Sequence, residues 1–359
     1  MDTLVLVLVC LCTVTTTYCQ TDVPQTFRLF YSFRGLTGVV VRLNPTDSTS
    51  WSATVLKTLT FADLSRRAIS MAFDTDQRAL YFTNTNRHVS KLTNDGRIKH
   101  LVQFDRGGAL DGVALDSANK MLYTFQTRTT RSSVYSGLRF LYNRDIYGLN
   151  NGALNFRSSS TGSSTTPPVV SIDSKNRLYY IRTSSSSLDA VHIDSDTKLV
   201  WNVLGALRIQ DIEVHPESGV LFATATTGSR IYILHPTQNG YRGITLNDES
   251  GDSFSPDRLA YDEPTNLLFI TDRSRAVVYI QYVNCTSYSS CSFRHHASFP
   301  LSRAGDFSSI AVMSCRDGED DCKNLKTYPS SRGFVGGLCA IFLYAAASLV
   351  GVGLRRCFK

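Results

Sequence analysis

Residues 68–84 read AISMAFDTDQRALYFTN: an apolar strand pattern, a short polar turn, and a second strand pattern that begins with Leu and an aromatic residue. Four further copies of this hairpin pattern are ALDGVALDSANKMLYTF (109–125), PVVSIDSKNRLYYIR (168–182), IQDIEVHPESGVLFAT (209–224) and PDRLAYDEPTNLLFITD (256–272). The equivalent positions Asp74, Asp116, Asp173, His215 and Asp262 are separated by 42, 57, 42 and 47 residues. A period of about 40–50 residues with several strands per copy is the signature of propeller blades.

Residue types alternate within the first strand of each copy, which supports the strand interpretation. Two apolar columns, expected to pack between blades, hold Met71, Val113, Val170, Ile212 and Leu259, and Phe73, Leu115, Ile172, Val214 and Tyr261. The column between them holds Ala72, Ala114, Ser171, Glu213 and Ala260. Small residues suit innermost strands that converge on a narrow axis. Asp, Asn, Gly and Pro in the turns favour tight hairpins.

A sixth copy is divided between the two ends of the repeat region. Residues 309–313 (SIAVM) match the innermost strand, and the missing outer strands are found at residues 28–33, 39–43 and 52–59. Joining the first and last strands closes the ring and removes exposed sheet edges. The sequence therefore predicts an all-β, six-bladed β-propeller over residues 20–315, closed by its N- and C-terminal strands.

The hairpins resemble the class B, or YWTD, repeats of the low-density lipoprotein receptor family, which are six-bladed propellers. The matching tetrads are Tyr81-Phe82-Thr83-Asn84, Tyr123-Thr124-Phe125-Gln126 and Phe269-Ile270-Thr271-Asp272, with looser matches at Tyr179 and Phe222. No copy reads Tyr-Trp-Thr-Asp, and the sequence shows neither a cysteine-dense module nor a tyrosine in its last five residues. Lipoprotein uptake is therefore not carried over from the resemblance.

The two ends of the chain predict a protein anchored at the cell surface. Residues 4–11 (LVLVLVCL) are apolar but too short to span a bilayer, and small residues follow, so residues 1–19 are interpreted as a signal peptide. Residues 333–354 carry no charge and are long enough for a transmembrane helix. The basic residues of 355–359 mark a cytoplasmic tail and place the N-terminus outside. Residues 316–332 form a polar stalk.

A lipid anchor attached at Ser330 or Ser331 is the alternative to the spanning helix. Small residues spaced four apart within 333–354 would allow close approach of two helices, and hence a homo-oligomer. Cys357, next to the membrane, is a candidate acylation site.

Four cysteines remain outside the predicted signal and anchor: Cys285, Cys291, Cys315 and Cys322. An even number in an oxidising compartment indicates disulfides. Three pairings are possible, and the short spacings favour Cys285–Cys291 and Cys315–Cys322. Asn284 begins the glycosylation sequon Asn-Cys-Thr.

The sequence contains few signs of chemistry. Basic residues are scattered and the formal charge is +7, so no nucleic-acid partner is expected. Asp211, Glu213 and Arg258 are the candidate pocket residues near the central channel, either as a structural ion pair or as a small-ligand or metal pocket. The pocket interpretation leads to a metal-dependent hydrolase as the alternative function. No Gly-x-Ser-x-Gly or His-Glu-x-x-His motif occurs.

We therefore expect an extracellular receptor or adhesion protein that presents a propeller to a protein ligand, without catalytic residues, metal or cofactor. Loops at the rim of a rigid ring suit protein recognition. The sequence does not identify the ligand.

Overall fold

The computed structural model describes residues 25–315 with internal gaps. The gaps are residues 33–34, 47–50, 61–67, 86–87, 104–108, 117–118, 130–132, 142–151, 156–168, 183–187, 195–197, 202–207, 226–229, 235–240, 248–250, 253, 273 and 302–306.

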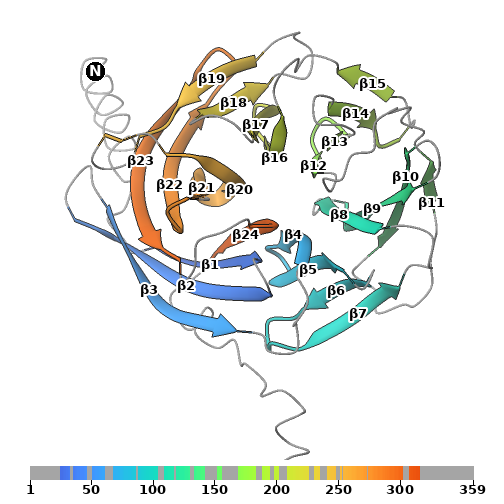
Figure 1. Ribbon diagram of the computed structural model, residues 1–359, viewed down its shortest axis with the longest axis horizontal. Helices are drawn as coiled ribbons and strands as arrows, with labels where there is room; N and C mark the ends of the chain where they lie inside the picture. The colour runs from blue at the N-terminus through green and yellow to red at the C-terminus, as the bar shows by residue number, and fades with distance from the viewer. Residues whose placement is uncertain are drawn as a thin grey trace, which may run out of the picture.

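The fold is an all-β propeller, in which the described strands form six four-stranded antiparallel sheets around a central axis (Figure 1). Three sheets consist of β4 (Ala68–Asp74), β5 (Ala79–Asn84), β6 (His88–Leu92) and β7 (Ile98–Gln103); β8 (Ala109–Asp116), β9 (Met121–Thr129), β10 (Ser133–Leu141) and β11 (Gly152–Asn155); and β12 (Val170–Asp173), β13 (Leu178–Arg182), β14 (Leu188–His192) and β15 (Lys198–Trp201). Two more consist of β16 (Ile209–His215), β17 (Val220–Ala225), β18 (Arg230–Leu234) and β19 (Tyr241–Thr245); and β20 (Pro256–Asp262), β21 (Leu267–Asp272), β22 (Val277–Cys285) and β23 (Cys291–Pro300). Each repeated hairpin of the sequence supplies the first two strands of one sheet.

The remaining sheet joins the two ends of the propeller, as the divided sixth copy predicted. It has the order β24-β1-β2-β3, with β24 (Ser309–Ser314), β1 (Gln25–Ser32), β2 (Leu36–Pro45) and β3 (Trp51–Thr60). β24 pairs antiparallel with β1, from Ser32 opposite Ser309 to Phe27 opposite Ser314. The innermost strand of this sheet thus comes from the far end of the repeat region.

The turns after the innermost strands are held by the side chains that the sequence pattern placed there. The Oδ1 atoms of Asp74, Asp116 and Asp173 accept backbone N–H groups two or three residues further on. The turns end with a residue at positive φ, namely Arg78, Lys120, Arg177, Gly219 or Asn266. The 3₁₀ helix η1 (Glu263–Thr265) forms the turn after β20. The tight turns expected from Asp, Asn and Gly are therefore confirmed.

The tetrads of the second strands are structural. Tyr81, Phe82 and Phe269 are fully buried, and Thr271 Oγ1 accepts the backbone N–H of Arg258 at 2.9 Å. Asp272 Oδ1 accepts the N–H groups of Ser274 and Arg275, which fixes the following turn. The tetrad therefore supplies a core aromatic, a bond to the innermost strand and a turn-capping oxygen.

Within the described ranges, no helix is long and apolar enough to cross a membrane. The predicted signal (1–19), stalk (316–332), spanning helix (333–354) and tail (355–359) lie outside the described residues, as do Ser330, Ser331 and Cys357. These interpretations of the chain ends stay predictions.

Candidate functional site

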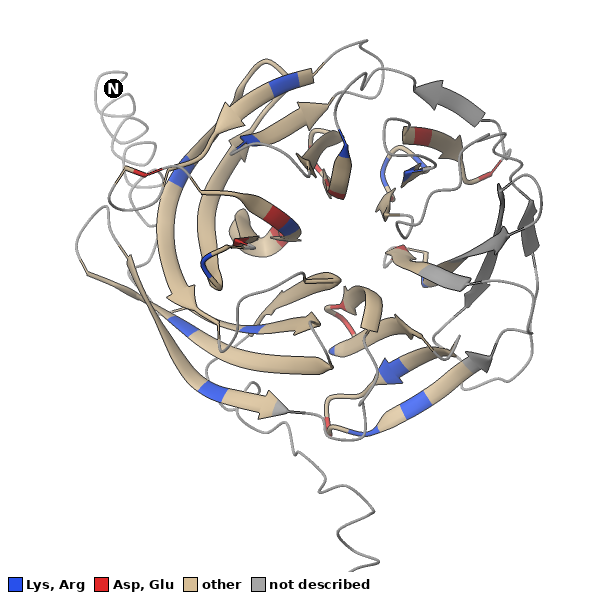
Figure 2. Ribbon diagram, in the orientation of Figure 1, with Lys and Arg blue, Asp and Glu red and all other residues tan. Residues whose placement is uncertain are grey.

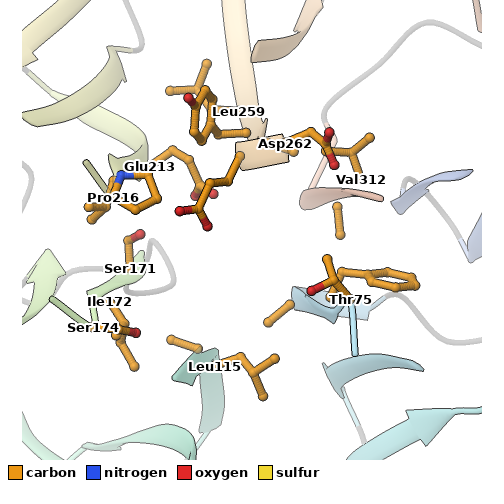
Figure 3. Close-up of a pocket in the computed structure, with 18 of the residues that line it drawn as sticks. Thr75, Leu115, Ser171, Ile172, Ser174, Glu213, Pro216, Leu259, Asp262 and Val312 are labelled. Carbon is orange, nitrogen blue, oxygen red and sulfur yellow. The ribbon is translucent and has the colours of Figure 1, made fainter. Parts of the chain in front are cut away.

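A cavity of about 840 Å³ follows the propeller axis and is walled by the innermost strands (Figure 3). The column of mainly small residues lines it, as the repeat alignment predicted: Ala72, Ala114, Ser171, Glu213 and Ala260. Residues of the two neighbouring apolar columns also reach the wall, among them Met71, Leu115 and Leu259. The channel wall therefore combines apolar side chains with polar groups in nearly equal measure.

Asp211 does not line this cavity, although the sequence placed it on the face of Glu213. Its Oδ2 accepts the backbone N–H of Leu259 in the next sheet at 2.9 Å, and its Oδ1 accepts that of Ile212 at 3.1 Å. The pairing register of β16 with β17 also shifts between Ile209 and Asp211. Burial raises the pKa of Asp211 to about 6, against the opposing charge of Arg258.

Arg258 donates to backbone carbonyls, while its charge also acts on the Asp211 carboxyl group. Its Nη1 donates to the carbonyl of Gln210 at 2.6 Å and its Nε to that of Phe307 at 2.8 Å. No direct ion pair joins Arg258 to Asp211 among the described residues. Each side chain satisfies the backbone of a neighbouring sheet, because inner strands expose backbone groups to each other at the axis.

The position of Asp211 has the same role in other sheets. Ser70 Oγ accepts the backbone N–H of Val113 at 3.1 Å, and Ser309 Oγ accepts that of Met71 at 3.1 Å. These residues directly precede the first apolar column of their repeats. Asp211 is therefore one member of a set of inter-sheet hydrogen bonds, a role that the sequence analysis missed and that the alignment column could have indicated.

Glu213 is the carboxyl group that points into the cavity (Figure 3). Burial raises its pKa to about 8, and the negative charge of Asp211 adds to the shift, whereas the backbone N–H of Tyr261 opposes it. At neutral pH the group therefore holds its proton. A protonated carboxyl donates a hydrogen bond and becomes an anion when a cation arrives.

Three further carboxyl groups line the cavity: Asp262 at the end of β20, and Glu217 and Glu263 in the turns after β16 and β20. Burial and the charge of Glu217 raise the pKa of Glu263. Lys175 also lines the cavity, and its Nζ donates to the backbone carbonyl of Glu217 at 2.8 Å. The sequence pattern placed these residues only in turns. Glu217 and Glu263 occupy corresponding turns of two successive repeats, and this recurrence could have indicated an acidic edge of the cavity.

The metal-dependent alternative required Asp211 and Glu213 to face the channel together, and they do not. In the described part of the chain, no group of three or more His, Cys, Asp or Glu side chains is arranged to hold a metal ion.

The predicted disulfide between Cys285 and Cys291 is confirmed, and it closes the end of the β22–β23 hairpin. Cys315 is also disulfide-bonded. Cys322 lies outside the described residues, so the second pairing stays a prediction. Asn284 is exposed, and it borders a second cavity of about 230 Å³ together with His215 and Tyr282.

Comparison with known proteins identifies the fold and no family. No protein-family model matches the sequence, and no curated protein matches it. A chain in the crystal structure of a nidogen/laminin complex is similar, with 15% identity and a TM-score of 0.56 over 80% of this chain and 98% of that one. A putative oxidoreductase (glucose dehydrogenase) from Thermus thermophilus has 14% identity and a TM-score of 0.47, over 66% and 84% of the two chains. The first likeness shows a propeller fold.

Proposed function

We propose that this chain is a cell-surface extracellular binding protein, of receptor or adhesion type, whose propeller binds a protein ligand. The observation that carries the proposal is the Cys285–Cys291 disulfide, together with a disulfide-bonded Cys315. Disulfides persist in oxidising compartments, which agrees with a signal peptide at residues 1–19. Residues 333–354 then hold the propeller at the membrane, either as a spanning helix or as the signal for a lipid anchor.

A binding role fits the shape better than catalysis does. A closed ring holds its loops on a rigid scaffold, and such loops commonly bind proteins. The similar chain in the nidogen/laminin complex belongs to a protein that binds another protein. We also propose that the ring is six-bladed and of the YWTD type, because its tetrads fill equivalent core positions. We assign no catalytic role, because Asp211 is used in inter-sheet hydrogen bonds.

Topology is tested with the full chain, tagged after Gln20 and again after Lys359. Antibody should label the first tag on intact cells and the second only after permeabilisation. Release of the protein by a phosphatidylinositol-specific phospholipase would instead identify a lipid anchor. Retention of the first tag inside the cell would overturn the proposed location. An Asn284→Gln variant should migrate faster on a gel if Asn284 carries a glycan.

Ligand binding is tested with cells that display the full chain. These cells are exposed to arrays of purified matrix proteins and receptor ectodomains, and cells displaying an unrelated propeller are the control. Saturable binding of at least one protein is expected. Absence of any saturable binding across both arrays, with the first tag exposed at the surface, would contradict the receptor or adhesion role.

A further inference from the structure

We propose that the central cavity binds a small organic cation, an ammonium group on an apolar body, with Glu213 as its counter-ion. This site is separate from the proposed protein-binding role, because it lies on the axis and not on the rim.

The dimensions of the cavity suit a small molecule. Its volume of about 840 Å³ falls within the range of about 300–1,000 Å³ that is usual for ligand pockets. Apolar side chains supply part of its wall, including Met71, Phe73, Val113, Leu115, Ile310 and Val312. These side chains would cover an aliphatic or aromatic body, while polar groups of the wall fix its orientation.

The acidic groups of the wall lie on one side. Glu213 and Glu217 come from β16 and its turn, and Asp262 and Glu263 come from β20 and η1. Figure 2 shows acidic residues within the part of the ring formed by β16 and β20. Asp262 is already hydrogen-bonded within the protein. Its Oδ2 accepts the hydroxyl of Thr265 at 2.6 Å, and its Oδ1 accepts the backbone N–H of Ser314 at 2.9 Å.

Glu213 has no cationic partner within the described residues. Its one hydrogen-bond donor there is the backbone N–H of Tyr261. Arg258 directs its guanidinium to two carbonyls, and Lys175 directs its Nζ to a third. Only the ionised form of Glu213 needs a counter-charge in such surroundings, and a ligand cation would provide it.

The ligand is an organic cation and not a metal ion, because of the donor set. Calcium takes about 6–8 oxygen ligands and zinc about 4 ligands in a compact shell. The described residues present no cluster of that kind. A carboxyl group beside apolar side chains suits an ammonium group that carries its own apolar body.

Binding should depend on pH. Asp211 on the same strand and the backbone of Tyr261 in β20 act on Glu213, and Glu217, Glu263 and Lys175 line the cavity at the turn end. Arg258 acts on Asp211. Burial holds the pKa of Glu213 near 8, so its carboxyl group is neutral in the empty cavity at pH 7. An incoming cation favours the ionised form, so binding expels a proton and becomes tighter as pH rises from 6 to 8.

The test uses calorimetry on the full chain with hexylamine, hexanol and hexanoate, which share an apolar body and differ in charge. Hexylamine should bind about tenfold more tightly than either analogue, the factor expected for one charge-assisted hydrogen bond. Titrations in two buffers of different ionisation enthalpy should show proton release at pH 7. Equal affinities, preference for hexanoate, or no proton release would overturn the proposal.

Variants locate the site. Glu213→Gln keeps the side-chain shape and should weaken hexylamine binding about tenfold while leaving hexanol binding unchanged. Asp95→Asn, at an exposed turn between β6 and β7, is the control and should change neither. Unchanged hexylamine binding in a folded Glu213→Gln chain would overturn the assignment. If that variant does not fold, the proposal is tested by the relative affinities of the unmodified chain for hexylamine, hexanol and hexanoate and by the pH dependence of hexylamine binding. Displacement of hexylamine by calcium or zinc would count against an organic ligand.

Discussion

At the scale of single residues, Asp211 joins two neighbouring sheets through backbone hydrogen bonds. Its carboxylate satisfies Leu259 in the next sheet and Ile212 in its own. Ser70 occupies the equivalent position and binds Val113 through a neutral hydroxyl. The two positions therefore allow a charged and a neutral version of the same inter-sheet bond to be compared.

Replacing Asp211 with Ala should lower the free energy of unfolding by about 2–3 kcal/mol, because two buried N–H groups lose their acceptor. Asp211→Asn should cost less, since the amide oxygen still accepts one N–H. Ser70→Ala, which removes two neutral bonds between this hydroxyl and the backbone of Val113, should cost about 1–2 kcal/mol. Urea unfolding at pH 7 gives all three values. An Ala variant as stable as the parent would show that the bonds contribute nothing.

His296 is a second residue whose contribution can be isolated. Its ring stacks on Trp51 with centroids 4.7 Å apart, and both ring nitrogens are buried without a hydrogen-bond partner among the described residues. Burial lowers its pKa to about 4, and the charges of Arg294 and His295 act in the same direction. The folded protein therefore keeps this imidazole neutral, whereas the unfolded chain protonates it near its ordinary pKa.

Stability should fall as pH drops from about 6.5 to 4, because the unfolded state then binds the extra proton. The full effect of this histidine is at most about 3 kcal/mol. His296→Phe keeps the ring contact and removes the titration, so the difference in unfolding free energy between parent and variant should change with pH over this interval. Parallel pH curves for the two proteins would contradict the prediction.

Sequence patterns predicted the channel-lining residues but not the direction of Asp211. Ala72, Ala114 and Ala260 recur at one position of the repeat, and small side chains are favoured where inner strands converge. Asp211 was misread because its acceptor role depends on the backbone of the neighbouring sheet. That backbone belongs to the next repeat, and its approach is set by packing around the ring.

At the scale of elements, the hairpin was the most predictable unit. Its alternation, turn residues and tetrad all act within about 17 residues, so local chemistry determines its form. The β22–β23 hairpin adds a covalent link, since Cys285 and Cys291 are paired opposite each other across its end. Arg242 of β19 donates to the carbonyl of Cys291 at 3.0 Å and ties this hairpin to the preceding sheet.

Replacing both Cys285 and Cys291 with Ser should lower the unfolding free energy by about 2 kcal/mol. The link closes a short loop, with a sequence separation of 6, and loops of this size restrict the unfolded chain by roughly that amount. The double variant avoids an unpaired thiol. Denaturant unfolding at pH 7, without reductant, measures the loss. An unchanged midpoint and slope of the unfolding curve would contradict this prediction and show that the disulfide does not contribute to stability.

At the scale of the whole molecule, the ring is closed by strands that are almost 300 residues apart in the sequence. The split sixth copy predicted this closure. The inner strand at the C-terminal end of the repeat region lacks outer strands, and the N-terminal end has outer strands that lack an inner one. The pairing places the end of β24 beside the start of β1, and the N–H of Cys315 donates to the carbonyl of Thr26 at 2.8 Å. Ile310 and Val312 of β24 enter the same apolar cluster as Phe27 and Leu29 of β1.

Closure by β24 should therefore be required for cooperative folding. A chain that ends before Ser309 would leave Phe27 and Leu29 without this strand and the β1 edge unpaired. A circular permutant carrying Cys315→Ser, in which a short loop links position 315 to Gln25 and the new ends lie in the 286–290 turn, retains every sheet and converts the closure into a hairpin. The Cys285–Cys291 bond would hold the new ends together.

The permutant should unfold in one cooperative transition with stability at least equal to that of the parent propeller, because a short covalent loop costs less closure entropy than a long chain. The truncated chain should lose this transition in denaturant and in calorimetry. Reduction of the permutant should lower its stability more than reduction of the parent, since its ends then separate. A truncated chain with the parent's transition would show that the other five sheets fold without the closing strand, and that ring closure is a consequence of folding and not its condition.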